Sequence, residues 1–146
     1  MIALLQRVAQ ARVEIEDRCV GAIGPGLLLF VCAEPDDTET QAERLIDRVL
    51  GLRVFADDAG RMNLSLQQVG GGLLVVSQFT LAADTTRGRR PSFDGAAPAG
   101  RGERLYEAVL ACARARHPVV ESGRFGAHMQ VHIVNDGPVT IPLTIR

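Results

Sequence analysis

The chain has 146 residues, of which 47% are hydrophobic, and its formal net charge is −1. This length can bury the core of one domain, so folding requires neither disulfides nor a structural metal. The positive residues, all of them arginine, number 16 against 17 acidic residues, and this balance excludes the generally basic surface of proteins that bind long nucleic acids.

The sequence carries no sign of export or of a membrane anchor. Its apolar start reaches Gln6 and Arg7 too soon for a signal peptide, and the longest apolar run, Leu27–Ala33, is far below the ~18 residues of a membrane span. Three cysteines without C-x-x-C spacing are expected to be small buried hydrophobes in a reducing compartment: Cys19, Cys32 and Cys112. We therefore expect a single domain over residues 1–146, in the cytoplasm and without a membrane partner.

The first half of the chain combines strand patterns with one helix. Strands are predicted at Ile2–Val8, Ala11–Glu16, Leu27–Ala33 and Leu52–Ala56. Apolar residues at helical spacing predict a helix over Asp36–Leu50, and Gly51 suits its C-terminal cap. Asp57–Gly60 has the composition of a turn.

The second half opens with Leu73–Leu81, whose aliphatic residues predict a strand buried on both faces. An irregular segment follows, from Ala82 to about Gly100, and loops of this length in a compact domain are often functional. A helix is predicted over Gly102–His117, ended by Pro118. Three β runs complete the chain: Val119-Val120, Ala127–Val134 and Val139–Ile145.

Polar residues interrupt the Leu73–Leu81 run where the core should continue. Ser77, Gln78 and Thr80 bring two hydroxyls and an amide, each of which costs ~1–3 kcal/mol if buried without a partner. In a strand, Ser77 and Phe79 would share one face, and Gln78 and Thr80 the other. The residues alone leave two interpretations open: polar groups satisfied near a sheet edge, or a ligand site at the end of the strand.

The histidines form no recognisable metal or catalytic group. His128 and His132 stand four apart in a predicted strand, ~13 Å, which is too far for one metal ion. His117 lies at the predicted helix end, where a capping role is expected. The sequence has neither a G-x-S-x-G elbow nor the lysine of a phosphate-binding loop. We expect no metal and no cofactor, while a triad of residues distant in sequence stays open.

Three arginines form the one dense basic cluster, Arg87, Arg89 and Arg90. One interpretation is a solvated loop. The other is a contact with phosphate, because the planar guanidinium fork matches phosphate geometry.

Several motifs occur together in a fixed order along nearly the whole chain. Ser77–Thr80 (SQFT) and Asn135–Thr140 (NDGPVT) resemble the signature pair of the D-aminoacyl-tRNA deacylases, and Gly88–Phe93 resembles the G-x-RPSF segment of that family. Three shorter stretches also fit: Gln6-Arg7-Val8, Gly60–Asn63, and Phe125–Ala127 before Met129. One departure is Arg61, where the family is expected to carry lysine; the charge is kept.

This resemblance implies a fold and a binding site. The expected fold is α/β, a mostly antiparallel two-layer β-sheet with two α-helices packed on one face, assembled as a homodimer. Ser77, Gln78, Phe79 and Thr80 would bind the terminal adenosine of tRNA and the ester.

The resemblance assigns a second role to Gly137 and Pro138. It implies a cis bond between them and a motif that reaches into the pocket of the neighbouring subunit, where it would refuse L side chains. Arg7 and Met129 match positions that line or brace this pocket. Without the resemblance, Asp-Gly-Pro between two strands indicates an ordinary hairpin turn, and only about 5–6% of X–Pro bonds are cis.

These residues supply hydroxyls, an amide and backbone groups, but no clear general base. Backbone N–H groups can stabilise the oxyanion of ester hydrolysis by ~3–4 kcal/mol per donor. Thr80 is a poor nucleophile without a base, so nucleophilic and positioning roles both stay open for it. An aminoacyl-tRNA ester is already activated, and the neighbouring ribose 2′-OH can assist attack by water, which the family resemblance also implies.

We therefore expect hydrolysis of the ester of D-aminoacyl-tRNA, giving free tRNA and D-amino acid, with clearance of glycine from mischarged tRNA as a second activity. The partners would be the acceptor end of aminoacyl-tRNA and a second copy of the chain. Two alternatives stay open. One is a sister deacylase that removes a small L-residue from the wrong tRNA. The other is a non-catalytic nucleic-acid-binding module that uses the Arg87–Arg90 cluster.

Overall fold

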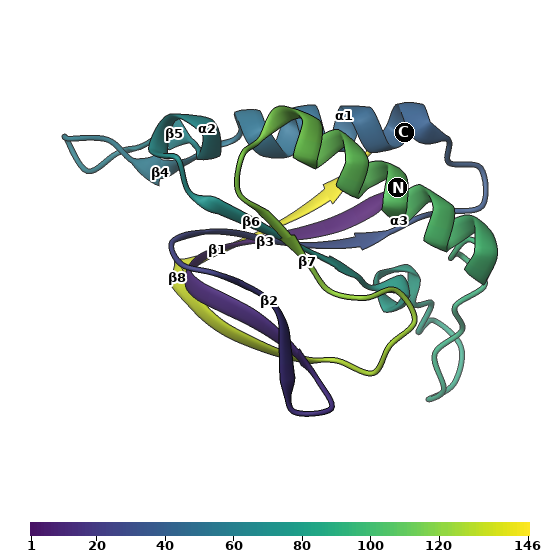
Figure 1. Cartoon of the computed structure of the whole chain (residues 1–146). Coiled ribbons are helices and arrows are strands. Elements are labelled where there is room, and N and C mark those ends of the chain that lie inside the picture. Colours follow the sequence, from purple (N-terminus) through teal and green to yellow (C-terminus); the bar gives the residue numbers. More distant parts are fainter.

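The computed structural model describes residues 1–146 and shows a curved β-sheet with helices on one face (Figure 1). The strands of the main sheet are β1 (Ile2–Ile15), β2 (Arg18–Ile23), β3 (Gly26–Cys32), β6 (Gly72–Ser77), β7 (Val120–Ser122) and β8 (Gln130–Thr144). A separate hairpin consists of β4 (Arg53–Ala56) and β5 (Met62–Ser65). The helices are α1 (Glu39–Gly51), α2 (Leu66–Val69) and α3 (Ala99–Arg116), with a 3-10 turn, η1 (Phe79–Ala82).

The main sheet is mixed. Its strands lie in the order β2-β1-β3-β6-β7, and β8 also pairs with β1. The pairs of β1 with β2, β3 and β8 are antiparallel, as predicted, but β6 runs parallel to both β3 and β7. The reason is that helical crossovers precede β6 and β7, and such a crossover returns the chain in its original direction. The mostly antiparallel sheet of the prediction is thus correct around β1 and wrong around β6.

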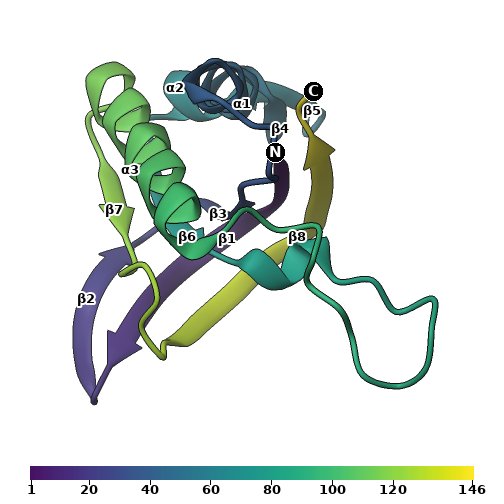
Figure 2. The ribbon, with the colours of Figure 1, turned by 90° about the vertical axis from the view of Figure 1, so that its right-hand side faces the viewer.

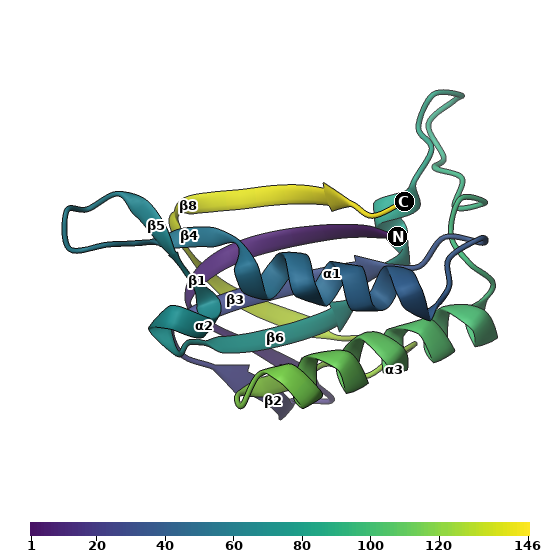
Figure 3. The ribbon, with the colours of Figure 1, turned by 90° about the horizontal axis from the view of Figure 1, so that it is seen from above.

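Both predicted helices exist, and both cover the same face of the sheet (Figure 3). Helix α1 begins at Glu39 rather than Asp36, because Thr38 is its N-cap: the backbone of Thr38 is extended, and its N–H donates to the side chain of Gln41 at 2.9 Å. Helix α3 begins three residues before the predicted Gly102 and ends at Arg116, with His117 as its cap. The short helix α2 was not expected. None of the helices combines the length and apolar character needed to cross a membrane.

Two apolar clusters hold the layers together. The larger lies between the helices and the sheet, where α1 buries the face predicted from its spacing: Ala42, Leu45, Ile46, Val49 and Leu50. The smaller lies on the opposite face of the sheet and includes Val8, Val13, Leu28 and Leu74. Figure 2 shows that the sheet is curved. Strand β1 contributes buried residues to both clusters along its length.

The cysteines are all free, and one differs from the expectation. Cys32 is buried and Cys112 half-buried, but Cys19 is exposed. The pairing of β1 with β2 shifts register after Val13, so Cys19 lies opposite Glu14 near the tip of the hairpin, outside the core.

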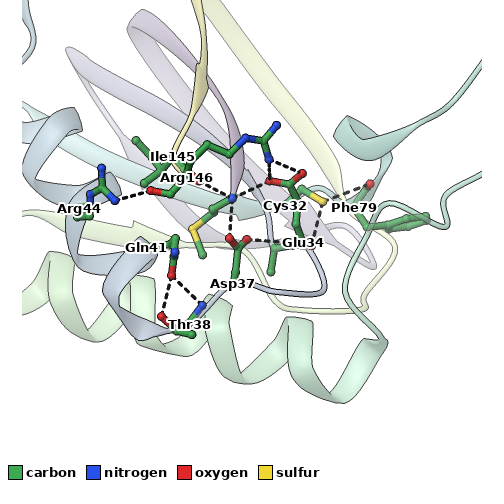
Figure 4. Close-up of polar contacts among 11 residues, drawn as sticks. Cys32, Glu34, Asp37, Thr38, Gln41, Arg44, Phe79, Ile145 and Arg146 are labelled. Atoms are coloured by element: carbon green, nitrogen blue, oxygen red, sulfur yellow. Dashed lines mark hydrogen bonds and ion pairs between the residues drawn. The ribbon is translucent and has the colours of Figure 1, made fainter.

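The α-amino group of Met1 is buried among acceptors at the end of β1. Its nitrogen lies 2.8 Å from carboxylate oxygens of both Glu34 and Asp37 and 2.8 Å from the carbonyl oxygen of Ile145 (Figure 4). Arg146 adds a second cation beside Glu34. Burial opposes ionisation of Glu34, but its hydrogen bonds from the amino group and Arg146 outweigh burial, so its pKa is lowered. This network ties both ends of the chain to the segment before α1.

Asp37→Ala is expected to destabilise the fold, because it leaves a buried ammonium and the N–H of Glu34 short of an acceptor. The loss should be about 2–3 kcal/mol, or a fall in Tm of about 5–10 °C. Calorimetry of the variant checks this value. Asp36→Ala is the matched control, because Asp36 is exposed; equal melting of the two variants would show that the network contributes nothing.

Candidate functional site

The polar stretch lies where β6 ends. The strand stops at Ser77, and its continuation to Leu81, which the sequence predicted, is wrong. After the N–H of Gln78 donates to the carbonyl of Val31 at 2.8 Å, the chain turns into η1. The expected alternation of Ser77 and Phe79 against Gln78 and Thr80 is therefore absent. Ser77 and Gln78 are half-buried, whereas Phe79 and Thr80 are exposed.

A cavity of about 630 Å³ opens at this point, at the carboxyl ends of the parallel strands β3 and β6. Pockets at such strand ends are a common ligand position in α/β sheets. Its lining residues are Val31, Cys32, Ala33, Ser77, Gln78, Phe79, Phe93, Asp94, Ala96, Ala97, Pro98, Ala99, Gly102, Tyr106, Phe125 and Gly126. Three residues of the SQFT motif thus line the cavity. Thr80 does not, but its hydroxyl oxygen lies 2.6 Å from Nε2 of Gln78, from which it accepts a hydrogen bond.

Aromatic side chains shape the walls. The rings of Phe79 and Phe93 meet edge to face with centroids 5.1 Å apart, although the side chain of Phe79 is 58% exposed. Tyr106 packs beside Phe125 and donates its hydroxyl to the carbonyl of Val75 at 2.9 Å. Burial raises the pKa of Tyr106, so its hydroxyl stays neutral and acts as a brace.

Few ionisable groups face the cavity. Asp94 is the one carboxylate in its lining and accepts a hydrogen bond from the hydroxyl of Ser92 at 2.7 Å. Burial raises the pKa of the Cys32 thiol, which lies 3.5 Å from the carbonyl oxygen of Phe79. No histidine lines the cavity. The polar groups of the lining are thus hydroxyl, amide and backbone groups together with one thiol and one carboxylate.

Cys32, Asp94 and Tyr106 were not identified from the sequence. Cys32 ends a run that was predicted as a central strand, and its position follows once β3 is known to lie parallel to β6. Asp94 directly follows the matched segment ending at Phe93. Tyr106 lies on the buried face of a helix, where the sequence pattern does not distinguish a cavity wall from the core.

Gly137 and Pro138 form a bulge within β8. The two predicted strands on either side of them are one strand whose pairing with β1 jumps from Asn135, opposite Val8, to Thr140, opposite Gln6. The Gly137–Pro138 bond is cis, which confirms the isomer implied by the resemblance. Both residues are exposed.

Side chains fix the shape of this bulge. Nδ2 of Asn135 donates to the carbonyls of Arg7 at 2.9 Å and Val139 at 3.0 Å. Arg7 in turn donates from Nε to the carbonyl of Asp136 at 3.2 Å. Gly137 has φ +127°, and a Cβ there would lie 2.8 Å from Cγ2 of Val139. Arg7 thus braces the bulge, and only glycine fits its centre.

Within one chain the bulge and the cavity are far apart. Ser77 pairs with Val31, and Val31 pairs with Ala3 of β1. Asn135 pairs with Val8, about 17 Å further along β1 and across its other edge. Neither Gly137, Pro138, Arg7 nor Met129 lines the cavity. The structure therefore divides the residues singled out by the sequence into two separate groups.

Met129 belongs to neither group directly. Its side chain packs against the smaller apolar cluster, and its sulfur lies 3.5 Å from the backbone nitrogen of Arg124. Met129 therefore contacts the backbone one residue before Phe125, which lines the cavity.

Two of the three histidines contact neighbouring elements. His132 lies on β8, with Nε2 3.0 Å from a carboxylate oxygen of Glu14. His117 is buried and contacts the carbonyl oxygen of Gly71. No cluster of three or more His, Cys, Asp or Glu side chains suits a metal ion.

Asn135→Ala is expected to loosen the bulge, because the carbonyls of Arg7 and Val139 lose their donor. The cost should be about 1–2 kcal/mol, with faster amide exchange over residues 135–140. Hydrogen–deuterium exchange measures both effects. Gln130→Ala provides the control on the same strand, since Gln130 is exposed; unchanged exchange at the bulge in Asn135→Ala would refute the role of Asn135.

Comparison with known proteins agrees with these features. The family model for D-Tyr-tRNA(Tyr) deacylase matches residues 4–144. The D-aminoacyl-tRNA deacylases of Methylibium petroleiphilum and Aromatoleum aromaticum are 67% and 64% identical to this chain, over 99% of it and 95% of each relative.

Solved structures share the fold. The c-Myc DNA unwinding element binding protein superposes with a TM-score of 0.95 at 37% identity, covering 100% of this chain and 99% of its own. A probable eukaryotic D-amino acid tRNA deacylase superposes with a TM-score of 0.82 at 18% identity over 97% of both chains, which concerns the fold alone. The family model and the close relatives together place the chain: it belongs to the D-Tyr-tRNA(Tyr) deacylase family.

Proposed function

We propose that this protein hydrolyses the ester of D-aminoacyl-tRNA, releasing tRNA and the free D-amino acid. The observation that carries the proposal is the cavity at the ends of β3 and β6, where Gln78 and Ser77 supply an amide and a hydroxyl. Its volume falls within the ~300–1,000 Å³ of small-ligand sites, enough for one nucleoside with its ester.

The lining suits the end of a charged tRNA. Phe79 and Phe93 offer apolar surfaces to the adenine base, while Ser77 and Gln78 offer hydrogen bonds to the ribose and the ester. In the 3-10 turn, the first backbone N–H groups have no partner inside the turn, so those of Phe79 and Thr80 are suited to an oxyanion.

The proposed reaction requires neither a general base nor a nucleophile from the side chains of the protein. No histidine faces the cavity, and Thr80 accepts a hydrogen bond from Gln78 rather than donating to a base. We assign Thr80 a positioning role. The 2′-OH of the terminal ribose assists attack by water on the neighbouring ester, whose leaving group is the 3′ oxygen. An ester of glycine fits the same site because it lacks a side chain, so removal of glycine from mischarged tRNA is a second activity.

The Gly137-Pro138 bulge serves the cavity of a second copy of the chain. Its distance from the cavity of its own chain supports this assignment, as does its exposure. Exposed Ile133 and Val134 extend an apolar surface beside the bulge on β8, and a partner can cover it. The rigid proline ring would then stand where an L side chain would project, which makes the site strict against L-esters and tolerant of many D-residues.

Hydrolysis of matched D- and L-tyrosyl-tRNA tests the function. The wild-type protein should cleave the D-ester and leave the L-ester intact. Pro138→Ala should weaken D-activity and admit some L-ester, because the ring that refuses it is gone. Pro142→Ala changes an exposed proline on the same strand and should behave as wild type. Full D-activity of Pro138→Ala with the L-ester still refused would place the chiral barrier elsewhere.

The roles of Thr80 and the ribose hydroxyl are tested together. Thr80→Ala should retain most of the turnover, whereas removal of a nucleophile costs about 10⁶-fold. A substrate with hydrogen in place of the terminal 2′-OH should bind normally and not react. Single-turnover rates and binding constants separate these effects. Loss of all catalysis in Thr80→Ala, or full turnover of the deoxy substrate, would contradict the mechanism.

A further inference from the structure

The segment between η1 and α3 contains a short loop that is closed at its base by Asp84 and Ser92. Asp84 and Ser92 form an antiparallel bridge, with backbone N–H to carbonyl distances of 2.8 and 3.0 Å. The carboxylate of Asp84 also accepts the N–H of Thr86 at 2.9 Å, and Gly88 provides the left-handed turn at φ +71°. The loop projects away from the body of the protein (Figure 2).

Arg87, Arg89 and Arg90 lie in this loop, all exposed and none with a side-chain hydrogen bond or ion pair. Five of the other arginines differ, because each lies within ion-pair distance of a carboxylate: Arg7, Arg12, Arg61, Arg116 and Arg146. The loop is thus a concentration of uncompensated positive charge on a chain whose net charge is −1.

The base of the loop is the rim of the cavity. Phe93 and Asp94, which line the cavity, directly follow Ser92, and η1 directly precedes the other side of the loop. Arg90 is two residues from Ser92, a span of at most about 7 Å of backbone. The three arginines are therefore outside the cavity lining, on a loop whose base borders the cavity.

We infer that Arg87, Arg89 and Arg90 bind the phosphates of the unpaired 3′ strand of tRNA that leads into the cavity. The inference rests on the proposed function. An adenosine in the cavity stays linked through its 5′ phosphate to the preceding nucleotides, so the strand must leave across the rim. Guanidinium groups bind phosphate by paired hydrogen bonds as well as by charge.

Contacts of this kind fit the task of the enzyme. Phosphate contacts position a nucleic acid without reading its sequence. The loop would thus hold the common end of every tRNA, while the cavity reads the ester. Only the few nucleotides near the ester need to be held, so three arginines are enough. The rest of the chain can therefore keep a balanced charge.

The test compares three variants on two substrates. Arg87→Ala/Arg89→Ala/Arg90→Ala removes the patch, and the corresponding triple lysine variant keeps its charge. Arg18→Ala/Arg48→Ala/Arg104→Ala removes the same charge from exposed positions outside the cavity lining, none of which has a carboxylate partner. The substrates are D-tyrosyl-tRNA and D-tyrosyl-adenosine, which has the same ester without a phosphate strand. Binding of uncharged tRNA is measured alongside, because it does not require turnover.

The triple alanine variant of the loop should raise KM for D-tyrosyl-tRNA and leave kcat/KM for D-tyrosyl-adenosine unchanged. Each phosphate contact on a single strand contributes about 0.7 to the slope of log affinity against log salt. Three lost contacts should flatten that slope by about 2, so between 50 and 200 mM salt wild-type binding should weaken about 16-fold more than binding by the variant. The lysine variant should keep most of the salt dependence, and the control variant all of it.

The outcomes separate the two proposals. Equal salt slopes for the loop and control variants would overturn the inference and leave the proposed function intact. Equal loss on D-tyrosyl-adenosine would also overturn it, since the loop would then act on the cavity itself. A third outcome is that the wild-type protein cleaves neither ester but binds tRNA, and that only the loop variant loses this binding. The phosphate site would then stand, and the proposed function would fail.

Discussion

The parallel alignment of β3 and β6 is the constraint on which the cavity depends. The two strands start together at Gly26 and Gly72, where a Cβ on Gly26 would overlap the backbone of Gly72. This close approach sets a register in which Val31 pairs with Ser77, so both strands end at the same edge. The chain must leave the sheet there, and η1 and the segment before α3 wall in the space. A larger residue at either glycine would push the starts of the two strands apart and disturb the register that aligns their ends.

Strand β1 supports both groups of candidate site residues. One part of this strand supports β3 beside the cavity, and another supports the bulge of β8. The two groups are thus separated along β1 within one chain. Under the proposed function, the cavity of one chain and the bulge of a second copy would together form one composite site. The proposed arrangement places recognition of the adenosine and ester in one subunit and refusal of L side chains in the other.

The sequence predicted most of the elements, because their patterns are local. The buried face of α1, from Ala42 to Leu50, follows from 3.6-residue spacing alone. The end of β6 did not follow, because Phe79 and Leu81 continue an apolar pattern that the backbone abandons after Gln78 donates to Val31. The parallel pairing was also missed, since direction depends on crossovers rather than on composition.

The candidate site was also predicted only where its residues belong to a local motif. Motifs identified Ser77, Gln78 and Phe79, which do line the cavity, and Gly137 with Pro138, which do not. Cys32 and Tyr106 reach the cavity through tertiary packing, and no pattern of the sequence separates them from other buried residues. The cis bond at Pro138 came from the family resemblance and not from the residues.

Complementation between subunits tests the central claim most directly. Ala96→Trp would fill the cavity, and Gly137→Val would distort the bulge, so each homodimer should be inactive on D-tyrosyl-tRNA. When equal amounts of the two chains are unfolded and refolded together, half of the dimers should be mixed, each with one intact site. The account predicts recovery of about a quarter of the wild-type activity. No recovery, with mixed dimers present, would contradict a site shared between two chains.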